Sequence, residues 1–365
     1  MAPIPTKLLI PLILALIFIA GFFMGNFSSS GPTRVVLRDG SGQTNNELPP
    51  SDEFPDTTDE YGRILVDLSA PIPTPPSLTV LSNKIDHEPP SCTSFEQVAK
   101  PSKFTFVIFI FTWAKQIERR KAMRETWGSL ATTDCGFRLI FVLGLQNETP
   151  GTQAECKKIQ AHVDDEARQF KDILQFGHFI DNSRTSTQKA TMTFEWSLRE
   201  CPNAEYTLKG EDHVWVNLPD FTKWIKEQKG DSIMGHRVYG GSVVFRDPQS
   251  FFYVSRDDWI DDTYPEYMTS MMYAIPQKIL KTLVDKAKTM KQMPLEDVFF
   301  TGIVADAAKV PRLNHESYEY DYIIDKNKKI GCPKKDLLAV RYMPPTEQYK
   351  YWEDKCHTIT KPCFA

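Results

Sequence analysis

Three adjacent side chains that can bind a cation occur at Glu211, Asp212 and His213. A short run of small and apolar residues, 206–209, precedes them, and an alternating stretch, residues 214–216, follows. Because burying such a polar cluster without partners costs free energy, we expect it at a strand end facing a cleft. The alternative is an exposed acidic turn.

The segments around this cluster alternate between strand-like and helix-like patterns. Residues 104–111 form a continuous apolar and aromatic run, which suits a strand buried on both faces of a parallel sheet, and residues 137–144 indicate a second buried strand. Strands are expected at residues 104–111, 137–144, 171–179 and 206–209, and helices at residues 119–127, 154–170, 188–199 and 277–290. This order predicts an α/β domain with a mostly parallel central sheet. Ligands of such sheets bind beyond the carboxyl ends of strands, which is where residues 211–213 would lie.

The composition excludes some partners. The net charge is −4, so the chain has no basic field suited to nucleic acid. There is no internal repeat and no glycine-rich phosphate loop. Lysines on one face of the expected helix 277–290 could help to hold a phosphate, although a solvated lysine face is far more common.

The amino-terminal region predicts entry into the secretory pathway. Residues 8–24 are apolar and uncharged, at the lower limit for spanning a bilayer and longer than most signal-peptide cores. With Lys7 on the cytosolic side, we expect a type II arrangement. Its parts are a cytosolic tail (1–7), a transmembrane signal anchor (8–24), a lumenal stalk (25–101) and a lumenal domain (102–365). A cleaved signal peptide and a buried core helix are the alternatives.

Several features agree with a lumenal location. Residues 25–101 are rich in Ser, Thr, Pro and Asp and bury too little apolar area to offset their ordering entropy, which predicts a largely disordered stalk. All seven cysteines follow the apolar segment, and in an oxidising lumen most should pair, leaving at least one free or intermolecular. Asn147 begins a glycosylation sequon suited to a lumenal surface loop.

Four stretches occur in order along the globular part: ERRKAMRETWG (118–128), FRLIFVLG (137–144), YTLKGEDHVWVN (206–217) and LEDVFFTG (295–302). Residues 166–183 and 251–267 add two further matches. Together they resemble glycosyltransferase family 31, the β-1,3-galactosyltransferase and β-1,3-N-acetylglucosaminyltransferase group, of which this chain would be a divergent member. The resemblance covers roughly residues 104–306 and implies a GT-A-type nucleotide-sugar transferase domain.

The resemblance also implies a reaction. Members of the family transfer a hexose from UDP-galactose or UDP-N-acetylglucosamine to a glycan hydroxyl of a glycoprotein or glycolipid, with inversion and a β-1,3 linkage. A divalent metal, usually Mn²⁺, neutralises charge on the leaving UDP. These enzymes reside in the Golgi membrane, with the catalytic domain in the lumen.

The resemblance assigns roles to several residues. Glu211 and Asp212 would bind the donor, and Asp212 and His213 the metal, although neutral imidazole suits Mn²⁺ less well than the family's carboxylate. Asp297 would be the general base, with Glu296 in support. Alternatively, the last two form an acidic pair at a helix N-terminus.

Two arginines, Arg120 and Arg124, match the family's R-x-x-x-R signature and lie on one face of the expected helix. They would position the donor phosphates, or they form a structural ion pair with an acidic loop. Residues 270–272, Ser-Met-Met, replace family glycines and would narrow the donor pocket. Arg341 falls near a position where the family often has histidine.

These departures leave a rival function open. The chain could be a catalytically inactive family member that binds glycans or proteins in the Golgi. A metal-dependent hydrolase, which would cleave a UDP-sugar without an acceptor, has only the acidic cluster in its favour.

Overall fold

The computed structural model describes residues 84–96, 105–149, 151–228, 230–248, 250–319 and 337–354. The expected cytosolic tail, the signal anchor and most of the stalk lie outside these residues. Within the described part of the chain, no helix is both long enough and apolar enough to cross a bilayer.

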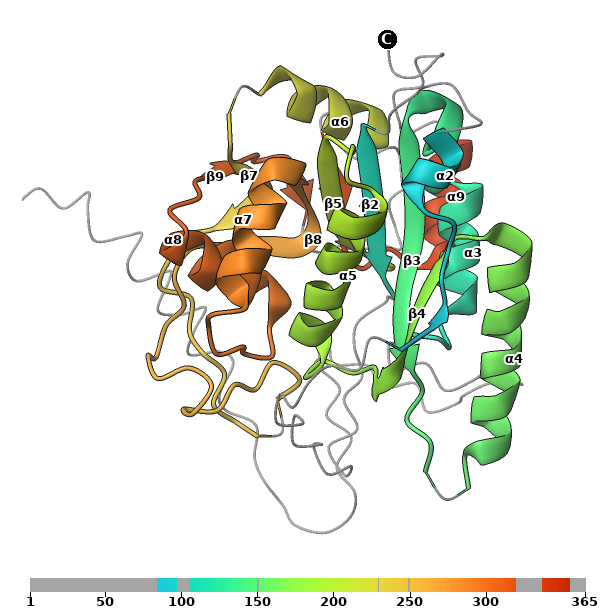
Figure 1. The fold of residues 1–365 in the computed structure, drawn as a ribbon, viewed down its shortest axis with the longest axis horizontal. Helices are drawn as coiled ribbons and strands as arrows, with labels where there is room; N and C mark the ends of the chain where they lie inside the picture. Colours follow the sequence, from blue (N-terminus) through green and yellow to red (C-terminus); the bar gives the residue numbers. More distant parts are fainter. Residues whose placement is uncertain are drawn as a thin grey trace, which may run out of the picture. The chain divides into compact units, whose positions relative to one another are not determined.

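Eight strands of the described residues form one mixed sheet, in the order β1-β4-β3-β2-β5-β8-β7-β9 (Figure 1). The strands are β1 (Ile85–His87), β2 (Phe106–Phe111), β3 (Phe137–Leu145), β4 (Ile173–Ile180), β5 (Tyr206–Glu211), β7 (Ile233–Val238), β8 (Tyr267–Pro276) and β9 (Arg312–Asn314). The neighbours from β4 to β5 are all parallel, as are β7 and β9, whereas β1 and β8 run antiparallel to theirs. The predicted mostly parallel α/β sheet is confirmed.

Helices cover both faces of this sheet. They are α2 (Cys92–Glu96), α3 (Ile117–Glu125), α4 (Gln153–Phe170), α5 (Ser186–Glu200), α6 (Leu218–Glu227), α7 (Gln277–Ala287), α8 (Ala305–Ala307) and α9 (Pro345–Glu353), together with the π-helix η4 (Val298–Val304). Side chains of β2 alternate between the two layers. Val107 and Phe109 pack with α5 and α7, whereas Ile108 and Ile110 pack with α3 and α6. Burial on both faces explains why β2 is apolar throughout.

A second, small sheet brings a distant segment to the end of β5. Its order is β10 (Tyr318–Glu319), β11 (Ala339–Val340) and β6 (Trp215–Val216). The antiparallel register pairs Val340 with Trp215. The residue that follows β11, Arg341, is thereby placed beside the residues that precede β6.

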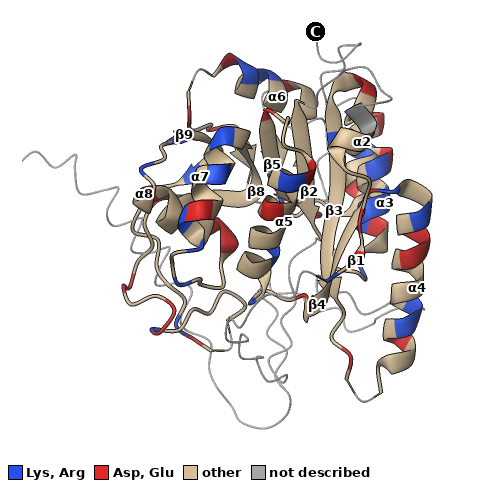
Figure 2. Ribbon diagram, in the orientation of Figure 1, with Lys and Arg blue, Asp and Glu red and all other residues tan. Residues whose placement is uncertain are grey.

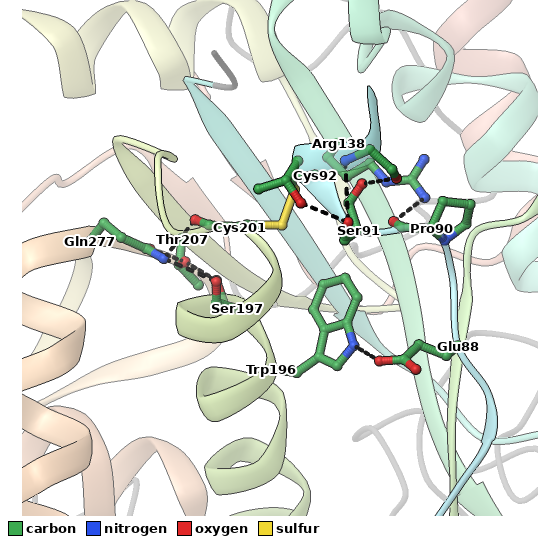
Figure 3. The surroundings of a disulfide bond; sticks show 12 residues. Glu88, Pro90, Ser91, Cys92, Arg138, Trp196, Ser197, Cys201, Thr207 and Gln277 are labelled. Carbon is green, nitrogen blue, oxygen red and sulfur yellow. Dashed lines mark hydrogen bonds between the residues drawn. A yellow bond between two sulfur atoms is a disulfide. The ribbon is translucent and has the colours of Figure 1, made fainter. Parts of the chain in front are cut away.

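A disulfide links the amino-terminal segment of the described chain to the end of helix α5. Cys92 of α2 bonds to Cys201, which caps α5, with a Cα–Cα distance of 4.8 Å (Figure 3). Nearby, the Trp196 indole N–H donates to Glu88 at 2.8 Å. Among the described cysteines Cys156 is free, which agrees with the odd cysteine count.

Both charge signs are interspersed on α4 and α7 (Figure 2).

Candidate active site

A pocket of about 510 Å³ opens at the carboxyl ends of β2, β4 and β5. Its wall includes Thr112 after β2, Asp181 after β4 and Glu211 at the end of β5. This is the edge at which parallel sheets bind ligands. The expectation that residues 211–213 face a cleft is confirmed, because all three line this pocket.

Asp212 is a buried carboxylate, and both of its oxygens accept hydrogen bonds from other side chains of the protein. The β2–β5 register pairs Phe111 with Glu211, so Thr112 lies beside Asp212. The Thr112 hydroxyl donates to Oδ2 at 2.6 Å, and Arg119 Nη1 donates to Oδ1 at 3.2 Å. Burial alone would raise the pKa of Asp212, but Arg119, His213 and Thr112 hold it well below its usual range. Asp212 therefore stays ionised and fixes the end of β5.

Glu211 presents its carboxylate to the pocket. Three cationic or polar neighbours surround it: Lys209 Nζ at 3.5 Å, His213 Nε2 at 3.2 Å and Arg341 Nη2 at 3.9 Å. Burial opposes ionisation, but the positive charges of Lys209 and Arg341 outweigh it and lower the pKa of Glu211 to about 2. It is a carboxylate throughout the physiological range.

His213 lies between the acidic cluster and the segment after β11. Its ring stacks on Tyr342 with centroids 5.2 Å apart, and its Nε2 lies 3.3 Å from Arg341 Nε. Burial lowers the pKa of His213, so the imidazole is neutral at neutral pH. A neutral ring that accepts from Arg341 at Nε2 carries its proton on Nδ1, which faces Asp212 Oδ1 at 3.7 Å.

The donor set of this cluster does not fit a divalent metal. A metal ligand must aim a lone pair at a point shared with other ligands. Both Asp212 oxygens accept hydrogen bonds from Thr112 and Arg119, and Nε2 of His213 faces a guanidinium. Among the described residues, no group of three His, Cys, Asp or Glu side chains converges so as to hold a metal ion. The structure brings the expected ligands Asp212 and His213 together, but with protein cations as their partners.

The second pair of carboxylates, Glu296 and Asp297, lines the same pocket immediately before η4. Glu296 is buried: the Tyr273 hydroxyl donates to Oε2 at 2.8 Å, and Lys209 forms an ion pair with Oε1. Asp297 is only partly buried, and its Oδ1 accepts from the Val298 N–H at 2.8 Å. The alternative of an acidic pair at a helix start therefore describes the local structure correctly.

Asp297 nevertheless has the properties of a general base. Burial and then the charge of Glu296 raise the pKa of Asp297 to about 7. A carboxylate with a pKa near the working pH both holds and releases a proton readily. Because Asp297 also faces the pocket, its position and its basicity agree with the predicted role.

Two buried lysines complete the polar wall. Lys209 contacts both Glu211 and Glu296, and its ammonium nitrogen lies 4.8 Å from the centre of the Phe111 ring. Lys189 of α5 pairs with Asp181 at 2.6 Å and donates to the Thr112 carbonyl at 2.9 Å. No motif in the sequence pointed to a role for Lys209. The feature that could have identified it is a lysine within a buried strand, because such a buried charge requires a charged partner.

The two signature arginines lie elsewhere. Arg120 is fully buried and donates from Nε and Nη2 to Glu166 Oε2 at 2.8 and 2.6 Å. Arg124 donates to the other oxygen of Glu166 and to both oxygens of Asp172. Neither lines the pocket, so the geometry matches a structural ion pair that joins α3 to α4 and β4. Arg119, which the sequence analysis did not single out, lines the pocket instead.

The Ser-Met-Met segment of β8 narrows the pocket less than predicted. Ser270 lines the pocket, whereas Met271 and Met272 are fully buried in the core. Met272 packs over Gly210 of β5, where an added Cβ would lie 2.7 Å from the Met272 methyl group. The two methionine side chains thus fill space in the core and do not enter the pocket expected to hold the donor.

The outer wall of the pocket is aromatic. Phe245, Phe251 and Phe252 come from the long connection between β7 and β8, and Phe245 and Phe252 are more than one third exposed. Asn147 does not line this pocket and is exposed in the loop after β3.

Comparisons with known proteins identify the family of this chain. The family model described as Galactosyltransferase matches residues 118–316. Lactosylceramide 1,3-N-acetyl-beta-D-glucosaminyltransferase of Mus musculus is 25% identical over 247 residues, which cover 66% of this chain and 64% of the relative. Beta-1,3-galactosyltransferase 5 of Gorilla gorilla gorilla is 24% identical over 249 residues, which cover 68% of this chain and 80% of the relative.

One solved structure, of a glycosyltransferase involved in the glycosylation of the major capsid of PBCV-1, aligns with a TM-score of 0.36 and 11% identity. The alignment covers 68% of this chain and 98% of that one. The chain spans just under two thirds of the length of the mouse relative. Because the family model matches more than half of the chain, the protein belongs to the galactosyltransferase family, as its resemblance to glycosyltransferase family 31 predicted.

Proposed function

We propose that this protein transfers galactose or N-acetylglucosamine from a UDP-sugar to a hydroxyl of a glycan, with inversion and formation of a β-1,3 linkage. The observation that carries the proposal is Asp297, a pocket-facing carboxylate with its pKa raised to about 7. It shares the pocket with Arg119 and Arg341, whose charges suit a diphosphate.

The chemistry assigns a task to each end of the pocket. Asp297 accepts the proton of the acceptor hydroxyl while that oxygen attacks the anomeric carbon. The bond from this carbon to UDP breaks on the opposite face, and its electron pair leaves on the β-phosphate, which inverts the configuration. The charge of Glu296, held by Lys209 and Tyr273, keeps Asp297 basic.

The remaining side chains suit the two substrates. Glu211, ionised and facing the pocket, can accept hydrogen bonds from the hydroxyls of the donor. The aromatic outer wall, Phe245 and Phe252, offers apolar faces to the acceptor sugar. The proposed acceptor is a glycan on a glycolipid or glycoprotein, and the name of the mouse relative specifies lactosylceramide.

The proposed location is the Golgi membrane, with residues 8–24 as a type II signal anchor and the α/β domain in the lumen. The Cys92–Cys201 disulfide suits an oxidising compartment, and Asn147 is exposed. In intact vesicles the domain should resist protease, and glycosidase treatment should shift the wild type but not Asn147→Gln. An unglycosylated domain that protease digests on intact vesicles would contradict this location.

The activity is tested by incubating the purified full-length protein with UDP-galactose or UDP-N-acetylglucosamine and a panel of glycan acceptors. Mass spectrometry identifies the product, and NMR assigns its linkage. The proposal predicts a β-1,3-linked sugar that depends on the acceptor. UDP binding without transfer would indicate an inactive family member, and UDP-sugar cleavage without an acceptor would indicate a hydrolase.

A further inference from the structure

Three protein cations occupy the surroundings of the acidic cluster in which the resemblance places a divalent metal. Arg119 contacts Asp212 at 3.2 Å, whereas Lys209 and Arg341 approach Glu211 at 3.5 and 3.9 Å. All three line the pocket. Each comes from a different part of the chain, namely α3, β5 and the segment after β11.

The charges of the ion-paired groups around the acidic cluster balance without a metal. Glu211, Asp212 and the nearby Glu296 contribute three negative charges, and Arg119, Lys209 and Arg341 contribute three positive charges. His213 adds none, because its Nε2 accepts a hydrogen bond from Arg341 and therefore carries no proton. A divalent cation is bound where carboxylate charge is in excess and its oxygens are available. Here the carboxylate charge is not in excess, and both oxygens of Asp212 already accept hydrogen bonds.

His213 forms a hydrogen bond with Arg341 that a carboxylate at the same position would change into a salt bridge. A carboxylate at position 213 would form a salt bridge with Arg341 and neutralise its charge. Imidazole instead accepts a hydrogen bond from Nε at 3.3 Å, which orients the guanidinium and leaves its full positive charge. Among the described residues, the other contact of Arg341 to an acid, Nη2 to Glu211, is 3.9 Å long and is no hydrogen bond.

Arg341 is therefore held in place with N–H donors still available to a ligand. A guanidinium has five such donors in a fixed fork, which matches two oxygens of a phosphate group. The Arg341 side chain is 17% exposed, so it is largely shielded from water, which strengthens its interaction with an anion. The stacked Tyr342 ring, 4.6 Å from the Arg341 guanidinium carbon, supports this orientation.

We propose that Arg341, oriented by His213 and assisted by Arg119, binds the donor diphosphate in place of a divalent cation, so that transfer needs no metal. This inference rests on the proposed function. As the bond from the anomeric carbon to UDP breaks, the electron pair passes to a β-phosphate oxygen, and Arg341 stabilises that charge while keeping its own protons. The acceptor proton goes to Asp297, so the step balances without a further reactant. Preorganised positive charge at a developing oxyanion is an efficient form of catalysis.

The test measures UDP binding by calorimetry and sugar transfer by mass spectrometry, on the full-length protein with excess EDTA or with excess MnCl₂. The inference predicts that UDP affinity and transfer rate in EDTA stay within about threefold of those in Mn²⁺. Arg341→Gln should weaken UDP binding in EDTA by about 10- to 100-fold, as expected for loss of charge-assisted hydrogen bonds. Arg341→Lys should retain part of the affinity. The control Arg199→Gln, an exposed arginine of α5, should bind UDP as the wild type does.

The contrary outcomes are distinct. Transfer that occurs only with Mn²⁺ would overturn the inference and leave the proposed function standing. Unchanged UDP affinity of Arg341→Gln in EDTA would also overturn it, and a thermal unfolding curve like that of the wild type would show that the variant is folded. Absence of transfer from any UDP-sugar under both conditions would contradict the proposed function itself, and the inference with it.

Discussion

Lys209 forms a buried ion pair with Glu296, the residue directly before the proposed base. The lysine lies on central strand β5, so the pair connects the sheet to the start of η4. Lys209 also approaches Glu211 at 3.5 Å and thereby links the two acidic groups of the pocket. Burial raises the pKa of Asp297, the charge of Glu296 raises it further and that of Lys209 lowers it, so this pair adjusts the basicity of the site.

Replacing Lys209 should destabilise the protein. Lys209→Met leaves Glu296 and Glu211 without their shared cation in a buried environment. Breaking a buried ion pair in this way costs about 3–5 kcal/mol. Urea unfolding followed by tryptophan fluorescence measures the change, and the double variant Lys209→Met/Glu296→Gln should recover part of it. A loss below about 1 kcal/mol would mean that water or a nearby group replaces the lysine.

The adjacent arginines Arg119 and Arg120 should behave oppositely. Arg120→Met removes a partner of buried Glu166, so the free energy of unfolding should fall by about 3–5 kcal/mol. The KM for the donor should stay within about twofold, because Arg120 is outside the pocket. Arg119→Gln should instead raise the KM for the UDP-sugar about tenfold, for loss of one charged hydrogen bond. The reverse pattern of KM values would return the donor-binding role to the signature arginine.

The rate should depend on pH through Asp297. A general base must be deprotonated, and burial raises its pKa to about 7, so kcat/KM should fall below about pH 7. Glu296→Gln removes a negative charge beside Asp297 and should move this acidic limb to lower pH. Lys209→Met removes a positive charge and should move it to higher pH. A profile that all three proteins share would assign the limb to another group.

Asp297 should also lower the free energy of unfolding of the protein at alkaline pH. Its folded pKa lies above the unfolded value of 3.8, so the stability that it contributes is complete below about pH 4 and is lost as pH rises through about 7. Asp297→Asn should therefore be more stable than the wild type at pH 8, by on the order of 1 kcal/mol for each unit of pKa shift. The difference should shrink toward pH 4. Melting temperatures of both proteins at the two pH values measure this, and equal values at pH 8 would contradict the raised pKa.

Local pattern was sufficient for the parallel strands β2 to β5 and for the helices α3, α4, α5 and α7. The apolar runs of β2 and β3 and the spacing of α4 and α5 place these elements within a few residues of where the structure has them. The carboxyl end of β5 then follows from sheet geometry, which is why Glu211 and Asp212 were correctly expected at a cleft.

The partners of these residues depend on contacts that one sequence does not display. Arg341 reaches His213 across 128 positions, because β11 pairs with β6. Consecutive residues of a helix point about 100° apart, so a motif centred on Arg120 says little about Arg119. Met271 and Met272 are both buried because β8 is covered on both faces by packing that comes from distant segments.

The central claim is that Asp297 accepts the proton of the acceptor hydroxyl, and kcat of Asp297→Asn tests it most directly. With a UDP-sugar and a glycan acceptor, kcat should fall about 10²- to 10⁴-fold, the usual contribution of a general base. UDP affinity, measured by calorimetry, should stay within about twofold, because asparagine keeps the shape of the side chain. A kcat within about threefold of the wild type would contradict the account and show that another group takes the proton.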